Sequence, residues 1–211
     1  MTLIAYHGRE ADKTAILDAL AAHRAADSLV QGYGYWQDGK GCAVGCTIQS
    51  GNHMEYETRF GIPVAIARLE DAIFEGLPVD LARQWPERLM GAIKPGADLS
   101  LVHWKLLHWL LTTPEVNPGI THPLVRDAVA RCADLIAVLA NGEVVTSNAA
   151  WSAASAASAA RSAAWSAAWS AAWSAAWSAE SARSAAWSAA SAASAAWVQI
   201  SDQLITLIEA A

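Results

Sequence analysis

Apolar residues in the first 140 positions recur every three or four residues, the spacing that places them on one face of an α-helix. The clearest case is Leu124–Ala140, which is followed by Asn141 and Gly142, residues that commonly end a helix. The same spacing predicts helices at 11–30, 53–60, 63–75, 78–93 with a break at Pro86, and 99–112. A short apolar stretch at 3–6 is read as a strand or an extended end, and no longer alternating pattern occurs. The chain is therefore predicted to be all-α.

The pattern changes beyond residue 145. From 149 to 197 almost every residue is Ala, Ser or Trp, and neither Gly nor Pro occurs between 143 and 211. Alanine has the highest helix propensity, so this segment is predicted to form a long helix. Its 49 residues would span about 73 Å, whereas a domain of 145 residues has a radius of gyration of only about 15 Å. The tryptophans lead us to expect a homo-oligomer formed through residues 149–197; the alternative is a repeat retained only because it is helical and soluble.

Two regions are thus expected. Residues 1–145 form a helical globular domain, which is long enough to bury a core without metals or disulfides and is interrupted by a Gly/Cys-rich loop at 31–53. The charged run at 68–71 is expected on the solvated face of its helix. Residues 146–211 form the repeat helix, and large apolar residues return from Trp197 onward, which predicts a terminal helix that docks.

Composition narrows the classes of function. The formal net charge is -6 and the pI is about 5.4, and the basic residues form no cluster, so general nucleic-acid binding is not expected. Serine interrupts the tail so often that no apolar run of 18 residues exists, and no membrane span is expected. The first residues lack the pattern of a signal peptide, and the three cysteines are an odd number. A cytoplasmic protein with reduced thiols is the simplest interpretation.

The loop at 31–53 carries the candidate chemistry. It is rich in aromatic residues and in glycine, which allows special backbone angles or the close approach of another group. Aromatic rings suit base stacking, and a lysine with backbone donors suits phosphate, although Lys40 lies too far from Thr47 for the P-loop pattern. The predicted ligand-binding residues are Tyr33, Tyr35, Trp36, Lys40, Gly41, Gly45 and Thr47.

The same loop offers two further interpretations. Cys42 and Cys46 are four residues apart and His53 follows, which matches half of a structural zinc site; zinc is the one cofactor considered, and otherwise none is expected. A cysteine near His53, with Glu55 or Glu57, also supplies the residue types of a nucleophile and its base. The plainer interpretation is that two small buried cysteines hold the loop in place.

Several stretches of the sequence resemble a family of uncharacterised bacterial and phage proteins. The stretches that carry the resemblance are Gly32–Trp36, Gly39–Thr47, His53, Tyr56–Glu57, Gly61–Pro63, Ala67–Asp71 and Phe74–Pro78. Members look similar over residues 3–140 and often carry tails rich in Ala and Trp or Tyr. The family implies no catalytic residue, because no activity is established for it. Its occurrence in phages and prophages implies an accessory role, such as counter-defence.

These patterns favour a non-enzymatic accessory protein that binds or sequesters a small ligand, such as a nucleotide, or a host protein. Two alternatives come from other classes of function. One is a small hydrolase that depends on a cysteine or a metal ion. The other is a structural protein that assembles through the repeat helix.

Overall fold

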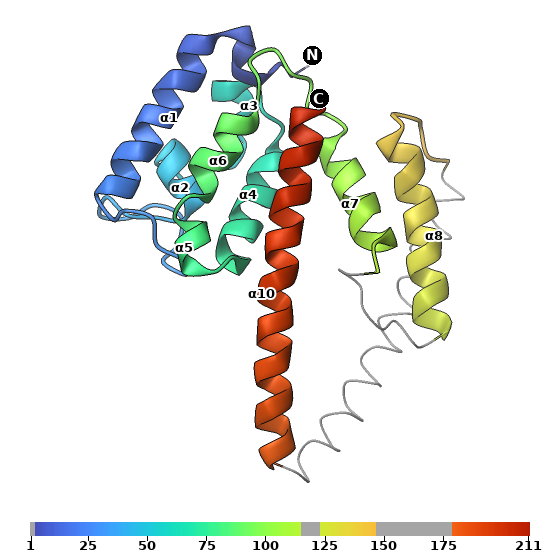
Figure 1. Ribbon diagram of the computed structural model, residues 1–211. Coiled ribbons are helices and arrows are strands. Elements are labelled where there is room, and N and C mark those ends of the chain that lie inside the picture. Colours follow the sequence, from blue (N-terminus) through green and yellow to red (C-terminus); the bar gives the residue numbers. More distant parts are fainter. Residues whose placement is uncertain (1–2, 115–122, 147–178) are drawn as a thin grey trace. The chain divides into compact units, whose positions relative to one another are not determined.

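The computed structural model describes residues 3–114, 123–146 and 179–211 (Figure 1). Contacts divide the chain into two compact units, one made of 1–103 with 197–211 and the other of 104–196. The described part of the chain is helical and contains only isolated β-bridges, between Leu29 and Gly41 and between Gln37 and Lys40. The all-α prediction is therefore confirmed. Most of the range 149–197 lies outside the described residues, so the homo-oligomer expected from it stays a prediction.

The first unit begins with a 3₁₀ turn and continues through short α-helices. Its elements are η1 (Ala5–Gly8), α1 (Glu10–Ala25), α2 (Ala43–Ile48), α3 (Glu55–Phe60), α4 (Val64–Gly76), α5 (Val79–Ala82) and α6 (Trp85–Ala92). The remaining described helices are α7 (Val102–Thr112), α8 (Pro123–Ala140) and α10 (Ala179–Glu209). None of these described helices combines the length and the apolar character needed to cross a membrane.

Local signals explain most helix ends. Gly61 has a φ of 63° and ends α3 in the left-handed conformation, and Gly142, with a φ of 77°, follows α8. Pro86 occupies the first turn of α6, where its missing N–H costs no helical hydrogen bond, so the predicted break there is confirmed.

Three predictions about local structure are wrong in part. The helix predicted at 11–30 ends at Ala25, because Asp27 turns the chain with a φ of 51°. The stretch at 3–6 is extended only up to Ile4, with a φ of -121°, because η1 begins at Ala5 and the backbone of Tyr6 and His7 is left-handed. Within the stretch expected to be a loop at 31–53, residues 43–48 form the helix α2.

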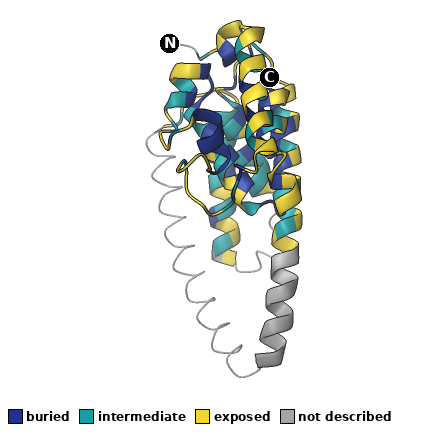
Figure 2. Cartoon of the chain, turned by 90° about the vertical axis from the view of Figure 1, so that its left-hand side faces the viewer, coloured by how far each residue is buried: buried dark blue, intermediate teal, exposed yellow. Residues whose placement is uncertain are grey.

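The core of the first unit surrounds α2, whose six residues are all buried (Figure 2). This short helix contacts α1, α4 and α6. Leu20, Ile66 and Leu89 are completely buried in these three helices. Small side chains at Ala43 and Gly45 let the neighbouring segments approach α2 closely.

The end of α10 belongs to the same unit. Leu204, Ile205 and Ile208 are buried, and Arg88 of α6 forms an ion pair of 2.7 Å with Asp202. Lys94 donates a hydrogen bond of 2.7 Å to the carbonyl oxygen of Glu209. The return of large apolar residues after the repeat therefore corresponds to a helix end that packs into a core.

Candidate functional site

We define the aromatic loop as residues 31–41, which connect the buried Leu29 to α2. The side chains of Tyr33 and Tyr35 are 42% and 44% exposed, and that of Lys40 is also exposed. Trp36 is half-buried, with its ring edge-on to that of His23 at a centroid distance of 5.2 Å. The other three predicted ligand-binding residues, Gly41, Gly45 and Thr47, are buried. The structure therefore splits the predicted set into an exposed aromatic part and a buried supporting part.

Tyr35 is held in place by three glycines. A Cβ atom added at Gly41 would lie 1.8 Å from the carbonyl oxygen of Tyr35, and one at Gly45 would lie 1.3 Å from it. A Cβ atom at Gly51 would lie 3.0 Å from the Tyr35 ring, and the His53 ring packs edge-on to it at a centroid distance of 5.0 Å. No larger residue fits at Gly41 or Gly45 without moving the loop. The chain thus fixes the backbone of Tyr35 while nearly half of the side chain stays exposed.

Part of the backbone of the aromatic loop is bonded inside the protein. Four of its amide groups donate internally: Gly32 to the Glu75 carboxylate, Gln37 and Lys40 to each other's carbonyl oxygens, and Gly41 to Ser28, at 2.8–2.9 Å. The amide of Cys42, directly after the loop, donates to Gly34 at 2.9 Å. A phosphate site built from backbone donors needs free N–H groups that converge on the anion, and these five amides are not free for that role.

Cys42, directly after the aromatic loop, and Cys46, in α2, are both buried and protonated. Cys46 is placed to donate from its thiol to the carbonyl oxygens of Ser28 and Gly41, at 3.5 and 3.6 Å. Burial raises the pKa of Cys46 to about 12, and burial together with the nearby Asp71 raises the pKa of Cys42 well above its ordinary range. The thiolate is the form that attacks substrates and binds metals. These environments favour the interpretation in which small buried cysteines hold the loop in place.

His53 is turned toward Tyr35 and Asp71 rather than toward a metal site. Its Nε2 atom lies 4.0 Å from Oδ2 of Asp71. Among the described residues, which include Cys42, Cys46 and His53, no group of three or more His, Cys, Asp or Glu side chains is close enough to hold a metal ion. The zinc half-site at Cys42, Cys46 and His53 stays a prediction.

The carboxylates considered as partners of a cysteine nucleophile have other contacts. Glu55 pairs with Arg59 at 3.3 Å, one turn further along α3. Glu57 accepts a hydrogen bond of 3.0 Å from the backbone N–H of Val64 at the start of α4. Both carboxylates thus serve the local structure of α3 and α4.

A buried polar network, which the sequence analysis missed, lies beneath α2. Glu70 is completely buried and accepts a hydrogen bond of 2.5 Å from the hydroxyl group of Tyr56. The hydroxyl group of Thr47 lies 3.4 Å from the other carboxyl oxygen and donates at 2.9 Å to the carbonyl oxygen of Ala43. Burial raises the pKa of Glu70 to about 8, so the carboxyl group is protonated at neutral pH. The expectation that the run 68–71 lies on a solvated face is wrong for Glu70. Its position between Ala67 and Ile73 on the apolar stripe of α4 was the available signal.

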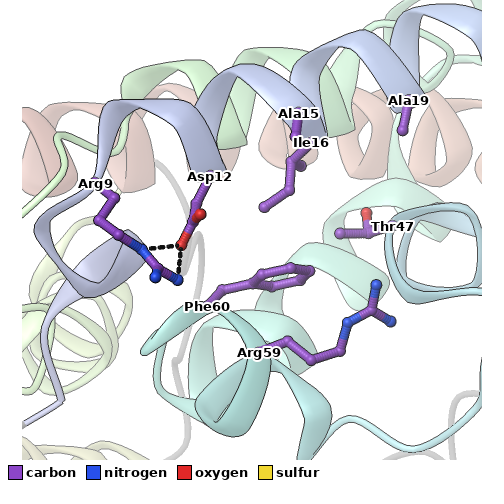
Figure 3. A pocket seen from close by; sticks show the side chains of 8 residues that line it. All are labelled: Arg9, Asp12, Ala15, Ile16, Ala19, Thr47, Arg59 and Phe60. Carbon is purple, nitrogen blue, oxygen red and sulfur yellow. Dashed lines mark hydrogen bonds and ion pairs between the residues drawn. The ribbon is translucent and has the colours of Figure 1, made fainter.

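A cavity of about 380 Å³ opens between α1, α2 and α3 (Figure 3). Arg9 and Asp12, an ion pair at 2.6 Å, lie at one end, and Thr47 lies at the other, with Phe60 between them. The complete lining is Arg9, Asp12, Ala15, Ile16, Ala19, Thr47, Arg59 and Phe60. Thr47 is the one predicted ligand-binding residue in this lining, and it also contacts the buried Glu70.

A second cavity, of about 250 Å³, lies at the start of the aromatic loop. It is lined by Asp27, Leu29, Val30, Gln31, Phe74, Val79, Ala82 and Arg83. Neither of these two cavities is lined by the aromatic side chains of the loop. Tyr33 and Tyr35 therefore lie outside both hollows.

Comparison with known proteins finds no matching family model, no matching curated protein and no matching solved structure. The resemblance to bacterial and phage proteins stays a prediction. What the chain does has to be inferred from the geometry of its own residues.

Proposed function

We propose that this chain is a non-enzymatic binding protein that recognises another protein through the aromatic loop, with Tyr35 as the central contact. The observation that carries the proposal is the packing of Tyr35. Its backbone is fixed against Gly41 and Gly45, while its side chain is 44% exposed. Tyrosine is enriched among the residues that dominate protein–protein binding energy. A side chain that is already ordered before binding loses less conformational entropy when the partner arrives.

The chemistry of the loop favours a protein partner over a nucleotide. Four backbone amides of the loop and that of Cys42 are bonded internally, as described above, and Lys40 is the one Lys or Arg in residues 31–41 that could contact a phosphate. The two exposed tyrosines lie outside both described cavities, whereas small ligands are usually bound in concave sites. Met54, which follows His53 in the chain, is 50% exposed and adds apolar surface. Exposed tyrosine rings provide a large contact area at a low cost in conformational entropy, which suits protein recognition.

The buried thiols argue against the hydrolase alternative. Both Cys42 and Cys46 have raised pKa values because of burial. A catalytic cysteine needs a lowered pKa or an adjacent base that accepts its proton. The accessory role implied by the resemblance to phage proteins suggests a host protein as the partner.

Site-specific photo-crosslinking tests the proposal in cells of the native host. A photo-reactive amino acid replaces Tyr33, and in a control variant it replaces Leu81, which is 43% exposed on α5 and lines neither described cavity. We expect a discrete crosslinked protein from position 33 that is absent from position 81. Identical products at both positions would contradict recognition by the loop.

The partner identified in this way is then purified and titrated against variants of the full chain. We expect Tyr35→Ala to weaken binding at least about tenfold and Leu81→Ala to leave it within about twofold. Equal affinity of Tyr35→Ala and the parent protein would overturn the proposal. Calorimetry with a panel of nucleotides tests the small-ligand alternative: binding that Tyr35→Ala abolishes would replace the protein partner by a nucleotide.

A further inference from the structure

The last turn of α4, residues 74–76, and the residue that follows it, Leu77, hold the beginning of the aromatic loop. The side-chain amide of Gln31 donates to the carbonyl oxygens of Phe74, at 2.6 Å, and Leu77, at 2.9 Å. The backbone N–H of Gly32 donates to the carboxylate of Glu75 at 2.8 Å. The carbonyl groups of a last helical turn have no partners within the helix, so Gln31 both caps α4 and ties the loop to it. The position of the loop therefore depends on the order of this turn.

The ring of Trp197, the last tryptophan of the Ala/Ser/Trp-rich segment, packs against the same turn. The indole ring lies so close to Gly76 that a Cβ atom there would be 2.2 Å from the ring atoms Cδ2 and Cε2. Gly76 is the final residue of α4, and its φ is not positive, so a special backbone angle does not explain the glycine. Close approach of the Trp197 ring does explain it.

Contacts further along α10 fix the helix that presents Trp197. Asp202 pairs with Arg88, and Leu204 and Ile208 are completely buried. The ion pair joins α10 to Arg88 of α6, a different helix from the one that ends at Gly76. It also supplies a control, because it can be broken while the ring stays on Gly76.

We propose that Trp197 is a positioning residue for the aromatic loop, acting through the last turn of α4. Helix ends fray readily unless they are covered or capped. The indole ring covers the last turn of α4. That turn accepts the hydrogen bonds of Gln31 and Gly32, which hold the start of the loop. Loss of the ring frees the carbonyl groups of Phe74 and Leu77 to move, and the loop loses its anchor. The proposal deepens the proposed function, since it makes the order of the binding loop depend on how α10 is seated.

Hydrogen exchange measured by mass spectrometry on the full chain tests this link without any partner. We expect Trp197→Ala to accelerate exchange of the amides of Gly32, Gly41 and Cys42 about tenfold. Gly76→Ala adds a Cβ that displaces the ring, so it should act in the same direction, and it serves as a second variant if Trp197→Ala fails to fold. Trp197→Phe keeps a ring and should restore most of the protection. In the double variant Gly76→Ala with Trp197→Ala, loop exchange should be no faster than in the faster-exchanging single variant. Both changes remove the same contact, so their effects do not add.

Arg88→Ala is the matched control, since it breaks the ion pair to Asp202 and leaves Trp197 on Gly76. It should leave loop exchange unchanged. Unchanged loop exchange in Trp197→Ala, or equal acceleration in Arg88→Ala, would overturn the positioning role. Affinity for the crosslinked partner separates the two proposals: faster loop exchange with full affinity keeps the positioning role and refutes binding through the loop.

Discussion

The aromatic loop and the buried network around Glu70 lie on either side of α2 and differ in whether their side chains are exposed or buried. Gly45 of α2 faces the carbonyl oxygen of Tyr35, and Thr47, two residues later, bonds to Glu70. In the loop, part of the backbone is bonded internally, and the side chains of Tyr33, Tyr35 and Lys40 are exposed. In the network, the side chains satisfy one another and are shielded from solvent.

This difference shows that residue type alone does not mark the functional site. The network holds a carboxyl group with a raised pKa and two hydroxyl groups, which are residue types used in catalysis. Each is nevertheless bonded within the core, and Trp85 completes the arrangement by donating to the Glu70 carbonyl oxygen at 3.0 Å. The exposed tyrosines carry less reactive chemistry, yet they are the groups that another molecule can reach.

The largest expected effect comes from removing the centre of the network. At pH 5, Glu70→Ala should lower the free energy of unfolding by about 3–5 kcal/mol, because it leaves a cavity and the buried Tyr56 hydroxyl without its acceptor. Glu70→Gln keeps the shape and an acceptor oxygen, and should cost about 1 kcal/mol or less. Urea denaturation followed by tryptophan fluorescence measures both. Equal losses in the two variants would mean that the network contributes nothing beyond packing.

The pH dependence of stability separates Glu70 from the exposed loop. Its folded pKa of about 8 lies above the ordinary value of 4.5, so between these values the folded chain keeps a proton that the unfolded chain has released. The contribution of Glu70 is therefore fully present below about pH 4.5 and is lost as the pH rises toward 8, by up to about 4 kcal/mol. Glu70→Gln should remove this slope and become more stable than the parent protein at pH 8. Parallel curves for the two proteins would contradict the assignment.

A pair of glycine substitutions tests how tightly the loop is seated. Gly45→Ala should destabilise the protein by about 2–4 kcal/mol, since its Cβ would overlap the carbonyl oxygen of Tyr35. Gly91→Ala on α6 is the matched control, because nothing lies within 4 Å of a Cβ there. It should stabilise the protein by about 0.5–1 kcal/mol through helix propensity. Similar midpoints of urea denaturation for both variants would show that the loop yields easily at Gly45.

The smallest expected changes in stability come from removing the hydroxyl group of one buried and one exposed tyrosine. Tyr56→Phe removes the hydroxyl that donates to Glu70 and should cost about 1–2 kcal/mol. Tyr35→Phe changes a partly exposed side chain and should alter stability by about 0.5 kcal/mol or less. Thermal denaturation of both variants checks the order. A larger loss for Tyr35→Phe would mean that its hydroxyl group supports the loop.

Local patterns in the sequence were sufficient for the all-α class, most helix positions, the break at Pro86 and the helix ends at Gly61 and Gly142. Helical spacing, glycine and proline act over a few residues, so their effects can be predicted without a fold. The same patterns singled out residues 31–53 as unusual and placed Tyr33 and Tyr35 among the candidate binding residues.

Only the tertiary structure decided which of those candidates are exposed and which are supports. Glu70 is buried because α2 and α3 cover its face of α4, and Gly76 is required because Trp197 returns to it from the far end of the chain. The sequence around Gly76 carries no sign of Trp197, and the apolar stripe around Glu70 indicates burial but not its partners. The burial of a polar group and the need for a glycine both depend on which distant segment packs against them, and that is determined by long-range packing rather than by local propensity.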